Sequence, residues 1–334
     1  ASNRPLVQAI STAKQPAAEF LDQDYPLERQ RDFALGIVQR FGYDHARGRL
    51  DGAVHPFEVS FTRNDVRITA RYERNFLPSG MFAVFHEAGH GMYEQNIDRA
   101  FTRTPFTTDL IGNYAVGGTS YGAHESQSRL WENHVGRSWD FWRLHFAELQ
   151  AYFPEQLKGV DEAAFYRAVN RVQPSLIRVP ADELTYDFHV MLRVELGRAL
   201  IDGSLKVGDA PAAWNSAMEA SLGVKVPDDR RGILQDPHWL WGQFGGFCSY
   251  TIGNVMAAQL YQAATAHGEG IGDALSRGEY EPLKSWLFEN IHRHGRRYTR
   301  NDLLLKATGR SLDPEPYIAY LRSKYSDLYD LPMS

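Results

Sequence analysis

The sequence predicts a mainly helical protein with one β-hairpin. Apolar residues recur at helical spacing through most of the 334 residues, and charged residues lie between them. One segment, residues 57–72, instead alternates apolar and polar residues as a strand does. We find no internal repeat, low-complexity linker or change of composition along the chain. We therefore expect residues 1–334 to form one continuous, mainly α domain.

The first predicted elements are a helix and the hairpin. Leu27, Phe33 and Ile37 lie at helical spacing and predict a helix over residues 26–41. In "FEVSF" and "DVRITARY" apolar and polar residues alternate, and the polar turn "TRND" joins the two stretches. The sequence "NFLPSG" predicts a loop after the hairpin. The next helix contains "FHEAGHGMYEQ", residues 85–95.

Periodicity predicts further helices in the rest of the chain. In "PADELTYDFHVMLRVELGRAL" Pro180 occupies the first turn and acidic residues follow it, as helix starts prefer. The sequence "VPDDRRGILQDPH" predicts a loop. The other expected helices cover residues 124–150, 161–172, 239–266, 281–298, 301–308 and 314–329.

Composition narrows the class of protein. An apolar fraction of 43% and a charged fraction of 23% are typical of globular proteins and argue against disorder. The net charge of −5 gives no electrostatic reason to expect a nucleic acid as partner. No apolar run approaches the ~20 residues of a membrane span, and we expect no membrane partner. The single cysteine, Cys248, excludes an internal disulfide and fits a reducing, cytoplasmic compartment.

Two histidines in "FHEAGHGMYEQ" predict a metal site. His86 and His90 stand four residues apart, so on a helix both imidazoles can face one point. Glu87 lies about 100° round the helix from His86, where it could hold a water without being a ligand. The alternative is a pair of ordinary packed histidines. Gly89 and Gly91 favour the metal site, because each costs a helix roughly 1 kcal/mol and so indicates close backbone approach.

A third ligand must come from another part of the chain. Glu94 continues the same helix face, but its Cα lies about 12 Å along the axis from that of His86, too far for a shared metal. The segment "AHESQSRLWEN" offers Glu125 and Glu132 on one helix face. Each could equally be a solvated glutamate or the partner of Arg129. Spacing alone leaves this choice open.

Polar residues near the hairpin suggest a place for a peptide. His55, Asp65 and Arg67 lie in or beside the two strands. An edge strand next to the His-containing helix could accept an extended peptide by main-chain hydrogen bonds. An ordinary surface hairpin with exposed charges is an equally good interpretation.

Two further segments place polar side chains among apolar ones. Arg178 could capture a carboxylate through two hydrogen bonds, although a pair with Asp182 or Glu183 is favoured by sequence alone. His238 and Tyr250 could donate hydrogen bonds to a developing oxyanion. The plainer interpretation of this second segment is an aromatic core with a satisfied histidine.

Six motifs follow one another along the chain: "HPF" (55–57), "DVRIT" (65–69), "HEAGH" (86–90), "HESQSRLWEN" (124–133), "IRVPADELTY" (177–186) and "GILQDPHW" (232–239). Each motif is weak to moderate by itself, but the ordered set is highly specific. Together they resemble the carboxypeptidase Taq family of zinc metallocarboxypeptidases, and the resemblance extends to the C-terminus. It implies an enzyme that removes C-terminal residues from peptides, with a helical deep-cleft fold like those of neurolysin and angiotensin-converting enzyme.

The resemblance also implies roles for particular residues. It selects Glu125 over Glu132 and Glu94 as the third ligand beside His86 and His90. It assigns the carboxylate of the peptide's C-terminus to Arg178 and oxyanion stabilisation to His238 and, less directly, Tyr250.

The remaining roles complete the expected mechanism. Glu87 is expected to move the proton from water to the leaving amine. His55 and Arg67 are the remaining expected substrate contacts. Zn²⁺ is the expected cofactor, Co²⁺ suits the same ligands, and a homodimer is expected.

Two alternatives and two departures from the family accompany this expectation. The same metal site could serve an endopeptidase or a dipeptidase, or stabilise a peptide-binding or scaffold protein without catalysis. The segment 98–122, between the two ligand motifs, looks extended by several residues. Full-length family members are longer, and the helices of one cleft wall that precede the hairpin are expected to be absent from this sequence.

Overall fold

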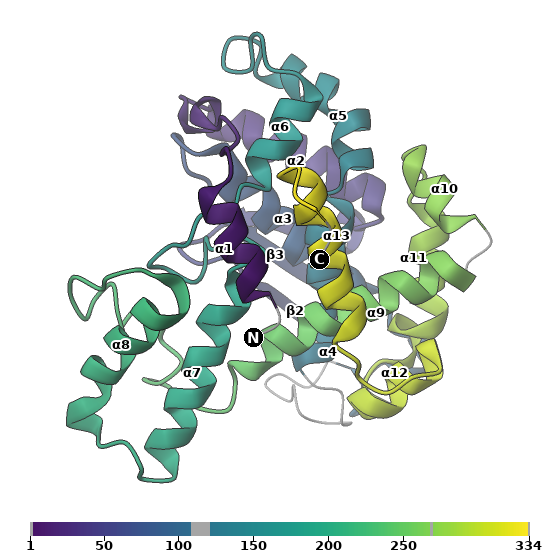
Figure 1. Cartoon of the computed structure of the whole chain (residues 1–334). Helices are drawn as coiled ribbons and strands as arrows, with labels where there is room; N and C mark the ends of the chain where they lie inside the picture. The colour runs from purple at the N-terminus through teal and green to yellow at the C-terminus, as the bar shows by residue number, and fades with distance from the viewer. Residues whose placement is uncertain (1–2, 108–120, 268–269, 333–334) are drawn as a thin grey trace. The chain divides into compact units, whose positions relative to one another are not determined.

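The structure is a computed structural model that describes residues 3–107, 121–267 and 270–332. It is mainly helical and contains one small sheet, which confirms the predicted fold class (Figure 1). The chain divides into two compact units. The first consists of Ala1–Gln15, Asn170–Ile252 and Leu321–Ser334, and the second of Pro16–Val169 and Gly253–Tyr320.

The second unit contains the sheet and most of the helices. Its strands are β1 (Gly48–Gly52), β2 (Glu58–Thr62) and β3 (Asp65–Ala70). Its helices are α2 (Leu27–Phe41), α3 (Leu77–Gln95), α4 (Tyr121–Arg129), the π-helix η4 (Leu130–Val135), α5 (Trp139–Tyr152), α6 (Glu162–Val169), α10 (Ile271–Ser276), α11 (Glu281–Asn290) and α12 (Arg300–Thr308). Short 3₁₀ turns cover η1 (Glu19–Asp22), η2 (His45–Arg47), η3 (Arg99–Phe101) and η6 (His292–His294).

The first unit contains α1 (Arg4–Thr12), α7 (Tyr186–Ile201), the 3₁₀ turn η5 (Val207–Asp209) and α8 (Ala210–Leu222). Helices α9 (Cys248–His267) and α13 (Glu315–Leu328) contribute residues to both units. Among the described residues, no helix is long and apolar enough to cross a membrane.

Two predicted helix starts are wrong, and local chemistry explains each. Helix α3 includes the predicted loop from Leu77 onward, because Pro78 occupies its first turn, where a missing N–H costs nothing. Helix α7 begins at Tyr186, well after Pro180. The side chain of Asp182 accepts hydrogen bonds from the backbone N–H and the hydroxyl of Thr185, and such local bonds compete with a helix.

Of two other predicted helices, one begins late and one is divided. The helix expected from residue 239 begins only at Cys248, after Gly242 adopts a φ of 72°. The single helix expected over residues 124–150 becomes α4, η4 and α5. The hydroxyl of Ser138 accepts a hydrogen bond from the backbone N–H of Phe141 and starts α5 as an N-cap.

The predicted hairpin is present, but it belongs to a three-stranded sheet. Strands β2 and β3 pair antiparallel, and β1 pairs parallel to β3, so the strand order is β1-β3-β2. The third strand, "GRLDG", is short and has no clear alternation. Its pairing with β3 places β2 at one edge of the sheet.

The two glycines of the His-containing helix allow close packing on two sides of α3. A Cβ added at Gly89 would lie 2.5 Å from the carbonyl oxygen of Gln127 and 2.6 Å from the Cα of Ser128, both on α4. A Cβ at Gly91 would lie 2.8 Å from Tyr43 and 3.2 Å from Ile68 of β3. The predicted close backbone approach is therefore confirmed.

Replacing Gly89 with alanine is expected to lower the free energy of unfolding by about 2 kcal/mol or more. The new Cβ meets the backbone of α4, which cannot move aside as a flexible side chain would, and this outweighs the roughly 1 kcal/mol gain in helix propensity. Gly36→Ala in α2 is the matched control, because no atom lies within 4 Å of its added Cβ. Urea unfolding followed by circular dichroism should show opposite shifts for the two variants. Equal changes in the free energy of unfolding would show that the close contact with α4 is not what requires glycine at position 89.

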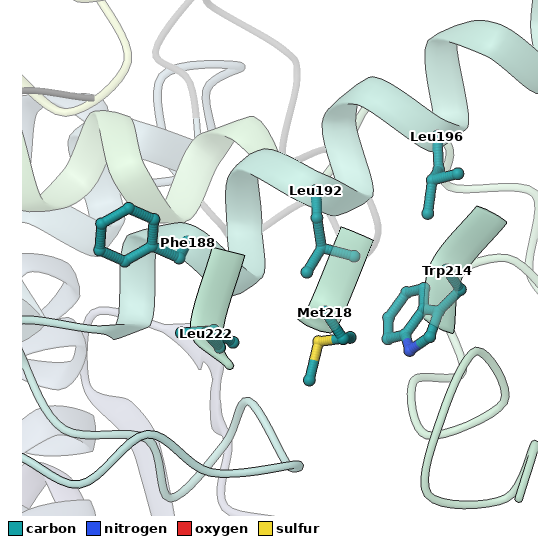
Figure 2. Packing of buried hydrophobic residues seen from close by; sticks show 6 residues of the cluster. All are labelled: Phe188, Leu192, Leu196, Trp214, Met218 and Leu222. Atoms are coloured by element: carbon teal, nitrogen blue, oxygen red, sulfur yellow. The ribbon is translucent and has the colours of Figure 1, made fainter. Parts of the chain in front are cut away.

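In the first unit, α7 and α8 pack through matching rows of apolar side chains. The buried residues recur every four positions on both helices, as Figure 2 shows: Phe188, Leu192 and Leu196 on α7, and Trp214, Met218 and Leu222 on α8. Residues spaced in this way lie on one face of a helix. Helix α8 was not among the predicted elements, although its spacing is helical.

Candidate functional site

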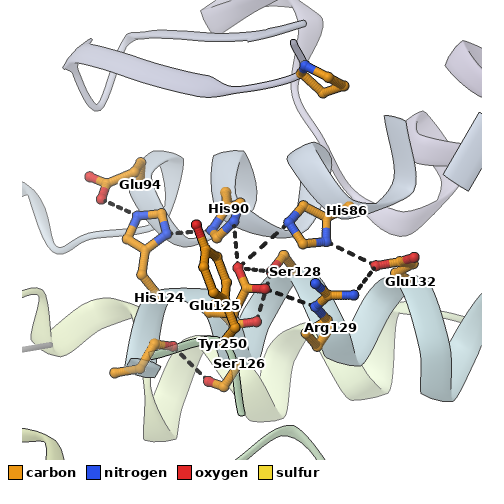
Figure 3. Close-up of polar contacts among 12 residues, drawn as sticks. His86, His90, Glu94, His124, Glu125, Ser126, Ser128, Arg129, Glu132 and Tyr250 are labelled. Carbon is orange, nitrogen blue, oxygen red and sulfur yellow. Dashed lines mark hydrogen bonds and ion pairs between the residues drawn. The ribbon is translucent and has the colours of Figure 1, made fainter. Parts of the chain in front are cut away.

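Helices α3 and α4 bring together a candidate metal site in the second unit. His86 and His90 lie one turn apart on α3, and Glu125 faces them from α4 (Figure 3). The Nε2 atom of His86 lies 3.5 Å from Oε2 of Glu125, and the Nε2 atom of His90 lies 3.2 Å from the same oxygen. The three side chains offer ligand atoms that all lie within 4.8 Å of one another, so they could hold a metal ion.

The chemistry of these donors fits a divalent metal. Ligands at about 2.1 Å from a tetrahedral Zn²⁺ are roughly 3.4 Å apart, which is close to the two separations of His86 and His90 from Glu125. Both histidines present Nε2 to the group, while each Nδ1 has a partner on the other side of the ring. Metal-binding histidines usually have such an outer hydrogen bond.

Arg129 orients two glutamates around the site. Its guanidinium donates to Oε1 of Glu125 at 2.8 Å and to Oε2 of Glu132 at 3.3 Å. Glu132 in turn accepts a hydrogen bond from Nδ1 of His86 at 2.9 Å. Each glutamate therefore forms the predicted salt bridge with Arg129 and also faces the histidines. Only Glu125 belongs to the group of possible ligands.

A glycine on α9 leaves room for Glu125. A Cβ added at Gly253 would lie 2.4 Å from Cγ and 2.6 Å from Cβ of Glu125. Any larger residue would push the carboxylate out of its position between the histidines and Arg129. The sequence analysis missed this glycine, because nothing near it in the chain points to the site.

Burial and neighbouring charges set the ionisation of the ligand group. Burial raises the pKa of Glu125, but His86 and Arg129 outweigh this and hold it well below its ordinary value. Burial also raises the pKa of Glu132, but Arg129 and His86 outweigh burial and lower this pKa to about 2. Burial lowers the pKa of His90 to about 3, so this imidazole is neutral. Burial also lowers the pKa of His86, but Glu125 and Glu132 raise it above its ordinary value. Ionised carboxylates beside imidazoles make a suitable environment for a cation.

Glu87 adjoins the ligands with an unengaged carboxylate. Its side chain forms no hydrogen bond with any of the residues that the structure describes, and the residue is 6% exposed. Burial raises its pKa to about 7; the His86 imidazole opposes this shift, and Glu125 and Glu132 add to it. A carboxylate that takes up a proton near neutral pH suits general acid–base chemistry.

Glu94 lies beyond the metal ligands and joins the site indirectly. Its Oε1 accepts a hydrogen bond from Nε2 of His124 at 2.7 Å, and Arg296 forms an ion pair with it. The Nδ1 atom of His124 lies 2.5 Å from that of His90. The geometric argument against Glu94 as a ligand agrees with these contacts. Residues 108–120 of the predicted extension lie outside the described residues.

Arg178, in the first unit, pairs with Asp236. Its Nη2 and Nε donate to Oδ1 of Asp236 at 2.7 and 3.1 Å, and its Nη1 donates to the hydroxyl of Tyr186 at 2.8 Å. The favoured expectation of a pair with Asp182 or Glu183 is therefore wrong. Asp182 accepts from Thr185 and from the backbone N–H of Gln173, and Glu183 accepts from Lys324 and Tyr325.

The Arg178 cluster carries one more positive than negative charge. Asp236 also accepts a hydrogen bond from Arg193 at 2.7 Å, so one carboxylate serves two buried guanidiniums. Burial works against the charge of Asp236, but the two arginines lower its pKa. Burial lowers the pKa of Arg193 to about 10 despite Asp236. An additional carboxylate would balance the charge of this cluster.

The other expected catalytic pair lies beside Arg178. His238 and Tyr250 share a hydrogen bond of 2.9 Å between Nε2 and the hydroxyl. The guanidinium carbon of Arg178 lies 4.7 Å from the centre of the Tyr250 ring, a distance at which cation–π attraction operates. His238 also stacks on Phe247, as the plainer interpretation of an aromatic core expects.

His55 precedes the edge strand β2, and Arg67 lies on the central strand β3 of the sheet in the second unit. His55 is exposed, and its Nδ1 faces the carbonyl oxygen of Pro56 at 2.7 Å. Arg67 pairs with Asp65 through two hydrogen bonds of 2.8 and 2.9 Å, and its side chain is 40% exposed. Both arrangements fit ordinary surface residues, and a role in substrate binding stays a prediction.

Sequence reasoning missed several residues that organise the two groups. Arg193 and Asp236 complete the Arg178 cluster, and His124 and Arg296 link His90 to Glu94. Arg296 lies 202 positions from Glu94 in the chain, so no local pattern could have joined them. His124 and Asp236 do lie inside two of the six motifs, HESQSRLWEN and GILQDPHW, so the motifs themselves carry a signal for them.

Two histidines one helical turn apart, with a glutamate from a crossing helix, are the metal-binding arrangement of an HExxH metallopeptidase. The chain belongs to the carboxypeptidase Taq (M32) metallopeptidase family, whose model matches residues 3–325. The resemblance seen in the sequence motifs is thereby confirmed. Membership of a metallopeptidase family implies a divalent metal in the protein.

Known relatives share sequence and structure with the chain. It is 41% identical to Carboxypeptidase 1 of Bacillus subtilis over 97% of this chain and 63% of that protein. It is 42% identical to Thermostable carboxypeptidase 1 of Thermus thermophilus over 97% of this chain and 62% of that protein. The M32 carboxypeptidase of Deinococcus radiodurans superimposes with a TM-score of 0.92 at 46% identity, over 98% of this chain and 64% of that one. The chain thus spans less than two thirds of the length of these relatives.

Proposed function

We propose that the chain is a metallocarboxypeptidase that hydrolyses the C-terminal peptide bond of peptides and releases single amino acids. The observation that carries the proposal is the group of His86, His90 and Glu125 in a member of the M32 family. Two imidazoles and one carboxylate leave a coordination position open, as in catalytic zinc sites. We propose zinc as the metal, and cobalt suits the same donors.

The proposed mechanism assigns the proton transfers to Glu87. A zinc ion in the site would polarise the scissile carbonyl and lower the pKa of water. Glu87 adjoins His86 and has a carboxylate that no described residue engages, so it can take the proton of the attacking water. Its pKa near 7 then allows it to return that proton to the leaving amine.

Arg178 is proposed to bind the carboxylate at the C-terminus of the substrate. Three of its five N–H groups donate to Asp236 and Tyr186, which leaves one on each terminal nitrogen for a ligand. The excess positive charge of the cluster supports this role, since a carboxylate would neutralise it. His238 and Tyr250 are proposed as donors to the oxyanion. His55, just before the edge strand β2, and Arg67, on the neighbouring strand β3, are proposed to contact further parts of the peptide.

The test measures bound metal and released amino acid together. The purified chain should contain about one zinc ion and should release the last residue from an N-blocked dipeptide. The same dipeptide as a C-terminal amide should react at least about 100-fold more slowly, because it lacks the charge that Arg178 binds. Equal rates on both substrates would favour an endopeptidase. Bound zinc without release from varied peptides would favour a peptide-binding or scaffold protein.

The domain organisation, oligomeric state and cellular location of the chain are also proposals. We propose that the chain acts as one catalytic domain, forms a homodimer and works in the cytoplasm. The single cysteine, Cys248, is exposed, which suits a reducing compartment. Sedimentation of the purified chain measures the oligomeric state, and a monomer at micromolar concentration would remove the homodimer.

A further inference from the structure

We propose that Arg296, Glu94 and His124 form a buried relay that holds His90 in the tautomer that binds metal. This inference rests on the metal site of the proposed function and assigns a positioning role to three residues that are not ligands. Glu94 and His90 lie one turn apart on α3, and His124 faces both from α4 (Figure 3). All of these residues belong to the second unit.

The relay consists of three consecutive polar contacts. The Nδ1 atoms of His90 and His124 are 2.5 Å apart, and Nε2 of His124 is 2.7 Å from Oε1 of Glu94. Arg296 then engages both carboxylate oxygens of Glu94, with Nη2 at Oε1 and Nη1 3.4 Å from Oε2. Glu94 is fully buried and Arg296 is 2% exposed, so solvent does not compete for these bonds.

The charge at one end places a proton on Nε2 of His124, and with a neutral imidazole this also sets the direction of the next hydrogen bond. The guanidinium of Arg296 keeps Glu94 ionised, and an ionised carboxylate only accepts hydrogen bonds. The Nε2 atom of His124 must therefore carry a proton and donate it to Glu94. In neutral His124 the Nδ1 atom is then an acceptor.

The proton arrangement of His124 also determines which nitrogen of the metal ligand His90 carries a proton. Two ring nitrogens 2.5 Å apart share one proton, so an accepting Nδ1 on His124 requires an N–H on Nδ1 of His90. The Nε2 atom of His90 then carries a lone pair, and this atom faces Glu125 in the ligand group. A metal ion needs that lone pair. The relay therefore favours the tautomer of His90 that can bind a metal ion through Nε2.

The two ligands reach the same state by different routes. His86 donates from Nδ1 directly to a carboxylate, Glu132, at 2.9 Å. Among the residues that the structure describes, Nδ1 of His90 contacts His124 and no carboxylate, and His124 in turn contacts Glu94. Glu94, which is too distant to be a ligand, thereby acts on the site through two hydrogen bonds.

Packing holds the distant end of the relay in place. The hydroxyl of Tyr93 donates to the carbonyl oxygen of Gly295 at 2.8 Å, and the ring of Tyr93 lies against both His124 and Arg296. The backbone N–H of Arg296 donates to the carbonyl oxygen of Phe106 at 3.0 Å. These contacts tie the segment after η6 to α3 and to the residues that follow η3.

Zinc affinity, measured by competition with a chromogenic chelator at pH 7, tests the relay. His124→Leu should raise the dissociation constant for zinc by about 10- to 100-fold, because Nδ1 of His90 loses its acceptor. His124→Asn should largely restore the affinity, since the carbonyl oxygen of asparagine can occupy the place of Nδ1 and accept from His90. If His124 only filled space, the leucine and asparagine variants should bind zinc with similar affinity.

Glu94→Gln tests the charged end of the relay. The amide has one acceptor oxygen for the donors of His124 and Arg296, so the expected loss of zinc affinity is again about 10- to 100-fold. Glu289→Gln is the matched control, because Glu289 also pairs with an arginine in the second unit but is 57% exposed. It should leave the affinity within about twofold of that of the unchanged chain.

The outcomes separate the relay from the proposed function. Zinc binding by the unchanged chain, with unaltered affinity in His124→Leu and Glu94→Gln, would overturn the relay alone. Failure of the unchanged chain to bind zinc would overturn the proposed function and the relay together. Circular dichroism of the metal-free variants checks their folding, and an unfolded Glu94→Gln leaves the His124 pair to decide.

Discussion

Glu87→Gln is expected to reduce kcat by about 100- to 10 000-fold while the protein keeps its full zinc content. Glutamine has the size of glutamate but cannot accept the proton of the attacking water at neutral pH. Glu87 is not among the side chains that could hold the metal, so the substitution leaves the ligand group of His86, His90 and Glu125 intact. Release of free amino acid from a blocked dipeptide, measured with elemental analysis of zinc, tests both parts.

The control for this variant removes a glutamate of ordinary environment. Glu219, on α8, is exposed, and Glu219→Gln should leave both kcat and zinc content unchanged. A Glu87→Gln variant with near-normal kcat would remove Glu87 from the mechanism. Loss of zinc together with activity would instead show that Glu87 supports the metal site.

Arg178→Met should lower kcat/KM for a free carboxylate substrate by about 100- to 1000-fold, equivalent to roughly 3–4 kcal/mol. The unbranched side chain of methionine fills part of the space of arginine but offers no hydrogen bond to a carboxylate. Asp236 retains its contact with Arg193, so the variant does not leave a buried carboxylate without a partner. For this reason the effect should fall on substrate binding more than on folding.

Comparing a substrate that has a free carboxylate with the matching amide tests whether Arg178 binds the carboxylate. The variant should lose the preference of the unchanged chain for a free carboxylate over the matching amide, because neither substrate now finds a positive charge. Arg231→Met, at an exposed arginine paired with Asp228, is the control and should keep that preference. An equal loss on acid and amide would contradict the carboxylate role and indicate a general disturbance.

Much of the fold could be predicted because helix and hairpin signals are local. The spacing of Leu27, Phe33 and Ile37 predicted α2, and alternation predicted β2 and β3. Strand β1 was missed because its stability comes from pairing with β3, which lies further along the chain. The start of α7 was misplaced because an Asp182 side chain competes with the first turn of the helix.

In the candidate site too, local features could be predicted from the sequence and long-range contacts could not. The four-residue spacing of His86 and His90 and the ordered motifs pointed to a metal-binding metallopeptidase, and family membership supports this class. The partner of Arg178 could not be chosen, because Asp236 is 58 positions away and nearer acidic residues competed for it. Long-range electrostatic partners depend on which elements fold together, and no local spacing records that.

The sequence by itself determined the helical class of this protein, the hairpin, the pair of imidazoles on α3 and the family to which the motifs belong. Only the tertiary structure brought Glu125 within 3.5 Å of both histidines, paired Arg178 and Arg193 with one carboxylate, and connected His90 to Glu94 through His124. The reason is physical: periodicity reflects contacts within one helix or strand, whereas a binding site is made by side chains that meet across elements distant in the chain.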